Sequence, residues 1–213
     1  MFELDHLMVE VDDPLHTANH VSETLGLPLA WPLTEKDEYT SIGVNFGDIN
    51  IEFIRFRVRF GIQGQRFNGL SGVALKTEAS IETVTTQLDH SRLSYRIGET
   101  CEAHTTLPIE ESQLFPTVFV VKYHFNTSGW LQRLQKDFTK CQGGKFHITR
   151  LKSLSIYSPK TPIHIANLLP IHFGDSNRII FESLNDEERV IADLIENLEI
   201  VMTPVNSKRN QSF

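Results

Sequence analysis

The stretch Pro14-Leu15-His16-Thr17-Ala18-Asn19 decides the fold, because it recurs as Pro162-Ile163-His164-Ile165-Ala166-Asn167. The two copies share Pro, His, Ala and Asn, and each is followed at the same distance by a glycine, Gly26 or Gly174. Self-similarity of this kind is typical of a fold built from repeated units. The sequence therefore predicts an α+β protein assembled from repeated strand–helix units.

The first copy lies in a segment that predicts a βαβββ module over residues 1–57. Apolar and polar residues alternate before the helix, as in a half-buried strand, and Asp13 and Pro14 suit a helix start. Gly26 suits its end. The predicted elements are a strand at 4–11, a helix at 14–26, and strands at 39–46 and 49–56 on either side of Gly47-Asp48.

The rest of the chain predicts a second module at 69–125 and an abbreviated third module at 148–203. The second module has predicted strands at 70–77, 95–97 and 117–125, a helix from Ser80, and a polar stretch at 101–111. The third has predicted strands at 151–156, 178–182 and 199–202, and helices at 162–174 and 187–198. We expect 126–147 to be a connecting helix or loop and 204–213 to be a disordered tail.

Composition excludes several classes of protein. The chain has 213 residues, 40% of them hydrophobic, and its 20 basic and 27 acidic residues give a net charge of -7. This charge disfavours nucleic acid and acidic membrane surfaces as partners. No apolar run approaches the ~20 residues of a membrane span, so we expect a cytoplasmic protein. Cys101 and Cys141 lie outside any CxxC motif and predict neither a zinc knuckle nor a disulfide framework.

Three motifs carry a resemblance to a known family. Leu4-Asp5-His6-Leu7, Leu25-Gly26-Leu27 and the run from Phe46 to Ile54 resemble the vicinal oxygen chelate superfamily, and within it the glyoxalase-like domain proteins. The resemblance covers most of the chain. It implies that the two modules within 1–125 pair into a curved mixed sheet, with helices on its convex side and a cup on its concave side.

The resemblance also implies a metal site. Many members hold a divalent metal with a His on the first strand and a Glu on the fourth strand of a module, and His6 and Glu52 occupy these places here. Imidazole and carboxylate are suitable ligands for Zn, Mn, Fe or Ni. His124, near the end of the second module's last strand, is the candidate third ligand. Gly72 and Ser153 stand where His6 would be matched in the second and third modules.

Two classes of function remain open at this stage. One is a metal-dependent lyase, isomerase or dioxygenase acting on a small oxygen-rich substrate, with Glu10 as the candidate base because it shares a strand face with His6. The other is a metal-free protein that binds or sequesters a small aromatic or hydrophobic compound. Trp31 and Trp130 either line the cup or belong to the core. A decayed site that leaves only homodimer or partner contacts is a third alternative.

Overall fold

Residues 3–56 form the predicted βαβββ module. The computed structural model describes residues 2–59, 62–63, 67–98, 100–110, 116–157 and 171–205. The elements of the first module are β1 (Glu3–Glu10), α1 (Pro14–Leu25), β2 (Leu29–Glu35), β3 (Tyr39–Asn45) and β4 (Asn50–Phe56). The region around Trp31 and Pro32, expected only to precede two strands, is itself the strand β2.

Local signals explain where α1 begins and ends. The backbone N–H of His16 donates to Asp13 Oδ1 at 3.0 Å, and Pro14 occupies the first turn. Gly26 adopts φ 70°, a left-handed conformation that favours glycine, and closes the helix. The buried face of α1 consists of Pro14, Ala18, Val21 and Leu25, so the helix packs against the sheet as its spacing predicted.

The second module repeats this order except that, among the described residues, no strand takes the place of β2. A short hairpin of β5 (Val58–Arg59) and β6 (Ile62–Gln63) precedes it. Its elements are β7 (Gly69–Lys76), α2 (Ile81–His90), β8 (His104–Pro108) and β9 (Thr117–Tyr123). The strand predicted at 95–97 is wrong, because Tyr95 makes only an isolated bridge with Ile109. The missing strand is β8, inside the polar stretch at 101–111.

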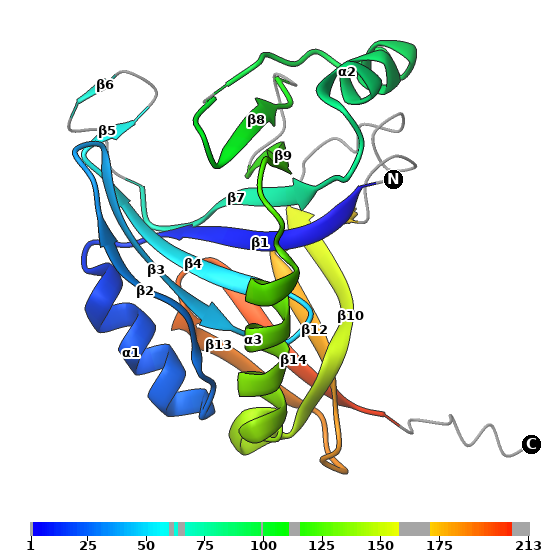
Figure 1. Cartoon of the computed structure of the whole chain (residues 1–213). Helices are drawn as coiled ribbons and strands as arrows, with labels where there is room; N and C mark the ends of the chain where they lie inside the picture. Colours follow the sequence, from blue (N-terminus) through cyan, green and yellow to red (C-terminus); the bar gives the residue numbers. More distant parts are fainter. Residues whose placement is uncertain are drawn as a thin grey trace, which may run out of the picture.

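The two modules share one seven-stranded sheet in the order β2-β3-β4-β1-β7-β9-β8. Its centre is the antiparallel pair β1 and β7, and each of these strands carries one extra residue, a β-bulge. The bulge in β1 is Asp5 and the bulge in β7 is Ser71, as the pairs on either side show. The halves are therefore related by an approximate two-fold axis that matches His6 with Gly72. Figure 1 shows β1 and β7 crossing the middle of the molecule.

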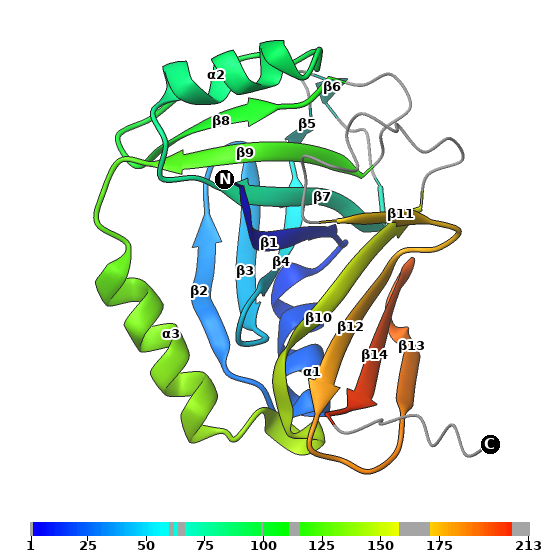
Figure 2. The ribbon, with the colours of Figure 1, turned by 90° about the vertical axis from the view of Figure 1, so that its right-hand side faces the viewer.

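The C-terminal part forms a second sheet. After α3 (Ser128–Lys140) and a 3-10 turn (Gly144–Phe146), its strands are β10 (Ile148–Tyr157), β11 (His172–Gly174), β12 (Arg178–Ser183), β13 (Arg189–Ile195) and β14 (Leu198–Pro204). Their order, β11-β10-β12-β14-β13, has the same parallel and antiparallel pairings as β4-β1-β7-β9-β8. Figure 2 shows this sheet beside the first one. The abbreviated part thus repeats strands from both halves of the large sheet.

The C-terminal part departs from the two helices predicted for it. The helix predicted at 187–198 is wrong: the segment contains β13, which pairs with β14. Strand pairing overrides the local pattern here, and the β-branched residues Val190 and Ile191 suit a strand. The helix predicted at 162–174 lies mostly outside the described residues. Gly174 is described, and it is the last residue of β11.

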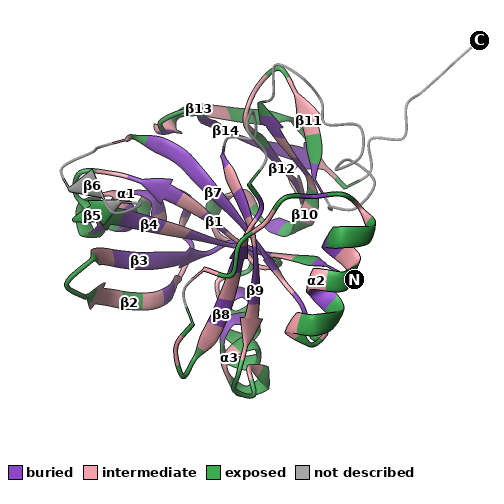
Figure 3. Ribbon diagram, turned by 90° about the horizontal axis from the view of Figure 1, so that it is seen from above, coloured by how far each residue is buried: buried purple, intermediate pink, exposed green. Residues whose placement is uncertain are grey.

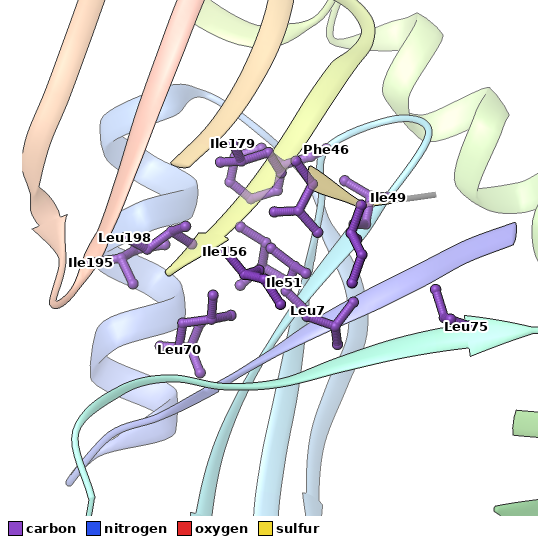
Figure 4. Packing of buried hydrophobic residues seen from close by; sticks show 14 of the residues in the cluster. Leu7, Phe46, Ile49, Ile51, Leu70, Leu75, Ile156, Ile179, Ile195 and Leu198 are labelled. Carbon is purple, nitrogen blue, oxygen red and sulfur yellow. The ribbon is translucent and has the colours of Figure 1, made fainter. Parts of the chain in front are cut away.

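The main core lies between the two sheets. Figure 4 shows Leu7, Ile51 and Leu70 of the large sheet facing Ile156, Ile179 and Leu198 of the second. The rings of Phe46 and Phe181 stack across this boundary with centroids 5.5 Å apart. In Figure 3 the buried residues concentrate on the central strands. This confirms the predicted α+β fold of repeated modules, and it leaves the other face of the large sheet to form a site.

No helix in the part of the chain that the structure describes has the length and apolar content needed to cross a membrane.

Candidate functional site

A cavity of about 530 Å³ lies on the face of the large sheet that points away from the core. Alternation along β1 creates its floor. Leu7 and Val9 pack into the core, whereas His6, Met8 and Glu10 line the cavity. Glu10 therefore shares a face with His6, as the sequence predicted.

Six aromatic side chains contribute to the wall. They come from both modules and from α3, and they are Trp31, Tyr39, Phe56, Phe119, Tyr123 and Trp130. The rings of Trp31 and Trp130 have centroids 6.3 Å apart and planes inclined by 55°. Tyr123 meets Trp130 edge to face at 6.1 Å. Both tryptophans thus line the cup, which decides the alternative that the sequence left open.

His6 is the best-supported polar side chain of the floor. Its Nδ1 lies 2.8 Å from Asp5 Oδ2, and the same oxygen accepts a hydrogen bond from the Tyr123 hydroxyl at 2.8 Å. In a regular strand Asp5 and His6 would point to opposite faces. Because Asp5 is the bulged residue of β1, its carboxylate can reach the neighbouring imidazole.

The hydrogen bond to Asp5 uses Nδ1 of His6 and leaves Nε2 available to a ligand or a proton. His6 Nε2 lies 3.6 Å from Glu52 Oε2. Since the carboxylate of Asp5 accepts from Nδ1–H, a neutral His6 presents an unprotonated Nε2 on the Glu52 side of the ring. The arrangement can therefore bind a ligand donor, or take a proton, at a nitrogen whose ring orientation is already held.

Burial, hydrogen bonds and nearby charges shift the pKa values of His6, Asp5 and Tyr123. Burial by itself would lower the pKa of His6, but the hydrogen bond to Asp5 and the charges of Asp5 and Glu52 outweigh it and raise that pKa. Burial would raise the pKa of Asp5, yet the hydrogen bond and charge of His6 and the bond from Tyr123 hold it below its usual value. Burial and the nearby carboxylates raise the pKa of Tyr123, so its hydroxyl remains a donor.

The second module does not repeat the polar pair. By the two-fold relation, Gly72 takes the place of His6, since Met8 pairs with Gly72 and His6 with Ala74. Glu52 lies beside Met8 in β4, and in the same way Phe119 lies beside Ala74 in β9. Phe119, rather than His124, is therefore the counterpart of Glu52. The polar chemistry of the floor lies in the first module.

His124 is not brought to His6 and Glu52. It follows the end of β9, and its Nε2 lies 2.9 Å from the Thr105 hydroxyl, whereas the cavity wall on that side is formed by Tyr123. Among the described residues, no three His, Cys, Asp or Glu side chains gather closely enough to hold a metal ion.

A divalent metal requires more protein donors than His6 and Glu52 supply. The separation of His6 Nε2 and Glu52 Oε2 suits two atoms on one zinc ion, which lie about 3.4 Å apart. Catalytic zinc sites normally have three protein ligands, and the described residues supply two. The described residues therefore do not complete a metal site by themselves.

Two members of the site were missed from the sequence. Strict strand alternation would place Asp5 on the face opposite to His6, and Tyr123 lies far from β1 in the chain. The only signal for Asp5 was its position next to His6, because a bulge cannot be read from one strand alone. Tyr123 becomes a partner only through the pairing of β9 with β7 and of β7 with β1.

Comparison with known proteins supports the fold. No family model and no curated protein matches the chain. A solved structure of a hypothetical protein from Staphylococcus aureus is similar with a TM-score of 0.67 and 13% identity, over 96% of this chain and 100% of that chain. An extradiol ring-cleaving dioxygenase from B. fuscum is similar with a TM-score of 0.58 and 10% identity, over 95% of this chain and 71% of that chain. That dioxygenase has the vicinal oxygen chelate fold, so the fold that the resemblance implied is confirmed.

Proposed function

We propose that the protein binds a small, predominantly apolar molecule with an aromatic or other planar part, and that binding needs no metal. The observation that carries this proposal is the lining of the cavity, in which six aromatic rings border about 530 Å³ and His6, held by Asp5 and Tyr123, lies on the floor beside Glu52. Small-molecule sites typically combine an apolar wall with a few well-placed polar groups. The volume suits a ligand of fragment to drug size.

In this proposal the floor orients the ligand. Asp5 and Tyr123 hold the ring of His6, so that Nε2 can form a hydrogen bond with the ligand, as a donor when His6 is protonated and as an acceptor when it is neutral, without losing much side-chain entropy on binding. Gly72 has no side chain, and a Cβ there would lie 3.1 Å from Met8 Cβ. The glycine thus keeps the second-module side of the floor open.

Fragment binding tests the proposal. Both tryptophans of the chain line the cavity, so their fluorescence reports on its occupancy. We expect members of a set of aromatic fragments to change this fluorescence and to raise the melting temperature, with and without EDTA. Thr117→Phe, which fills the cavity, should weaken binding at least about tenfold. Thr139→Phe on the exposed face of α3 should leave binding unchanged. Failure of every fragment to bind would contradict the proposal.

A metal-dependent lyase, isomerase or dioxygenase is the second candidate, and the adjacency of His6 and Glu52 is the observation that favours it. These two residues would hold Zn, Mn, Fe or Ni, and Glu10 would be the base on the same strand face. The incomplete donor set is the reason it ranks second.

Metal analysis separates the two candidates. Protein purified without chelators is incubated with Zn, Mn, Fe or Ni salts, desalted, and analysed for metal. Near-stoichiometric metal that disappears in His6→Ala would favour the enzyme. Metal-free protein that still binds fragments would favour the metal-independent ligand site.

A further inference from the structure

The wall of the cavity has the geometry of an aromatic enclosure. Trp31 and Trp130 are inclined to one another by 55°, and Tyr123 meets Trp130 at 71°. Each ring therefore presents a different direction to the space that all three line. The faces of such rings carry negative quadrupole charge and attract cations within about 6 Å.

The floor adds net negative charge. Asp5 and Glu52 are carboxylates on either side of His6, with contacts of 2.8 Å and 3.6 Å to its two nitrogens. One imidazolium can balance only one of them, so the three groups carry at least one negative charge in either protonation state of His6. His6 also lies edge to face with Trp31 at 6.2 Å, which places this charge next to the aromatic wall.

The basic residues that line the cavity do little to offset this charge. Among the described lining residues Arg96 is the only arginine or lysine, and its Nε is paired with Glu110 at 3.0 Å. Both side chains of this pair are about half exposed to solvent, at 48% and 51%. Solvent therefore screens the pair, whereas Glu52 is only 15% exposed. Within the described part of the chain, the ion-pair contact of Glu52 is the 3.6 Å contact with His6, and its carboxylate lines the cavity, where it can face a ligand.

We infer that the ligand is an organic cation with an aromatic or apolar body, held with its charge against Trp31 and Trp130 and near the carboxylate of Glu52. This inference rests on the proposed ligand-binding function and adds the charge of the ligand to it. An anionic ligand would meet the carboxylate of Glu52 at close range, whereas Asp5 is buried and does not line the cavity. A neutral ligand would use the rings but gain nothing from Glu52.

Three probes of similar shape test the charge preference. Phenyltrimethylammonium is the cation, tert-butylbenzene is its neutral isostere, and benzenesulfonate is the anion. Binding is followed by tryptophan fluorescence and checked by calorimetry. We expect the cation to bind about tenfold more tightly than the neutral isostere, and benzenesulfonate to bind least.

Variants show which residues produce the preference for the cation. In Glu52→Gln, which keeps the shape of the side chain, the cation should lose its advantage while the neutral probe binds as before. Glu187→Gln, an exposed carboxylate beside β13, is the matched control and should change neither affinity. Trp130→Leu should weaken the cation more than the neutral isostere.

The outcomes separate this inference from the function on which it rests. If the neutral or anionic probe binds as tightly as the cation, or if Glu52→Gln keeps the preference, the inference is wrong and the ligand-binding function stands. If none of the three probes and no member of the fragment set binds, both are wrong.

Discussion

The two modules of the large sheet are related by an approximate two-fold axis at the central pair β1 and β7, yet they differ in chemistry. In the first module the bulged residue, the residue after it and the β4 residue that pairs with Met8 are Asp5, His6 and Glu52. In the second the corresponding residues are Ser71, Gly72 and Phe119. The backbone framework of the site is therefore duplicated, whereas its ionisable groups are not.

This difference assigns separate tasks to the two halves. The first module supplies charge and a held imidazole, and the second supplies space at Gly72 and an aromatic surface at Phe119. A bulge next to a site re-aims side chains, and both modules keep it. We conclude that the bulge belongs to the fold, and that the residue placed on it decides the chemistry.

The largest expected effect comes from removing the charge on the first bulge. Asp5→Asn leaves His6 without its buried anionic partner, and we expect it to reduce the free energy of unfolding at pH 7 by about 3 kcal/mol. Ser71→Ala is the matched change in the second module, where the Ser71 hydroxyl makes only a 3.4 Å contact with the Met8 carbonyl. It should cost less than about 1 kcal/mol. Urea unfolding of both variants measures the contrast, and equal losses would contradict it.

A second change would make the modules alike. Gly72→His combined with Phe119→Glu places a His and a Glu at the positions that mirror His6 and Glu52. Four such donors on one floor should bind Zn or Ni about 100-fold more tightly than the natural chain does, or about 2.7 kcal/mol. Calorimetric titration with each metal measures this.

The control for Gly72→His combined with Phe119→Glu is the same double substitution in a His6→Ala background. It should lose most of the gain in metal affinity. Unchanged metal affinity in a folded double variant would show that the two halves are not superimposable at the level of side chains. Met8, whose Cβ and Sδ lie 3.1 Å and 3.2 Å from the position of a Cβ on Gly72, must shift to admit the new imidazole.

The third prediction concerns pH, and its effect is smaller. The pKa of His6 is raised by folding, so its contribution to stability is complete below its ordinary value of 6.5 and is lost as the pH rises through the folded value. The pKa of Asp5 is lowered, so its contribution is present above 3.8 and is lost as the pH falls through the folded value. Stability should therefore decline on both sides of this window.

Urea unfolding between pH 5 and pH 9 tests the alkaline side, over a range of about four units around the ordinary pKa of a histidine. His6→Gln should flatten the decline above pH 6.5, because the second module has no ionisable group at the corresponding position. A decline of the same slope in His6→Gln would assign it to other groups.

The parts of the fold that could be predicted from the sequence depend on local signals. Helix α1 is an example, since Asp13, Pro14 and Gly26 act within a few residues of the helix ends. The position of His6 and Glu52 on one face also followed, because it needs only strand alternation and the resemblance to a known fold. Both side chains line the cavity.

The features that escaped prediction depend on pairing between distant strands. The segment of β13 was predicted as helix because its partner β14 could not be identified from its own residues. The sequence indicated His124 as the candidate third ligand. The residue that corresponds to Glu52 is Phe119, and only the register of β9 against β7 identifies it. The role of Asp5 depends on a bulge, which exists only relative to the partner strand.

The smallest expected effect comes from the one basic residue that the second module adds to the described cavity lining. Arg96 and Glu110 are both about half exposed, so Arg96→Gln should change the free energy of unfolding by less than about 0.5 kcal/mol. If the floor of the first module attracts a cation, removal of Arg96 should nevertheless raise the affinity for phenyltrimethylammonium about twofold, with a smaller gain at high salt. Affinity for tert-butylbenzene should not change. A gain that is equal for both probes would mean that Arg96 acts by its bulk at the cavity, and the charge difference between the two modules would then play no part in ligand choice.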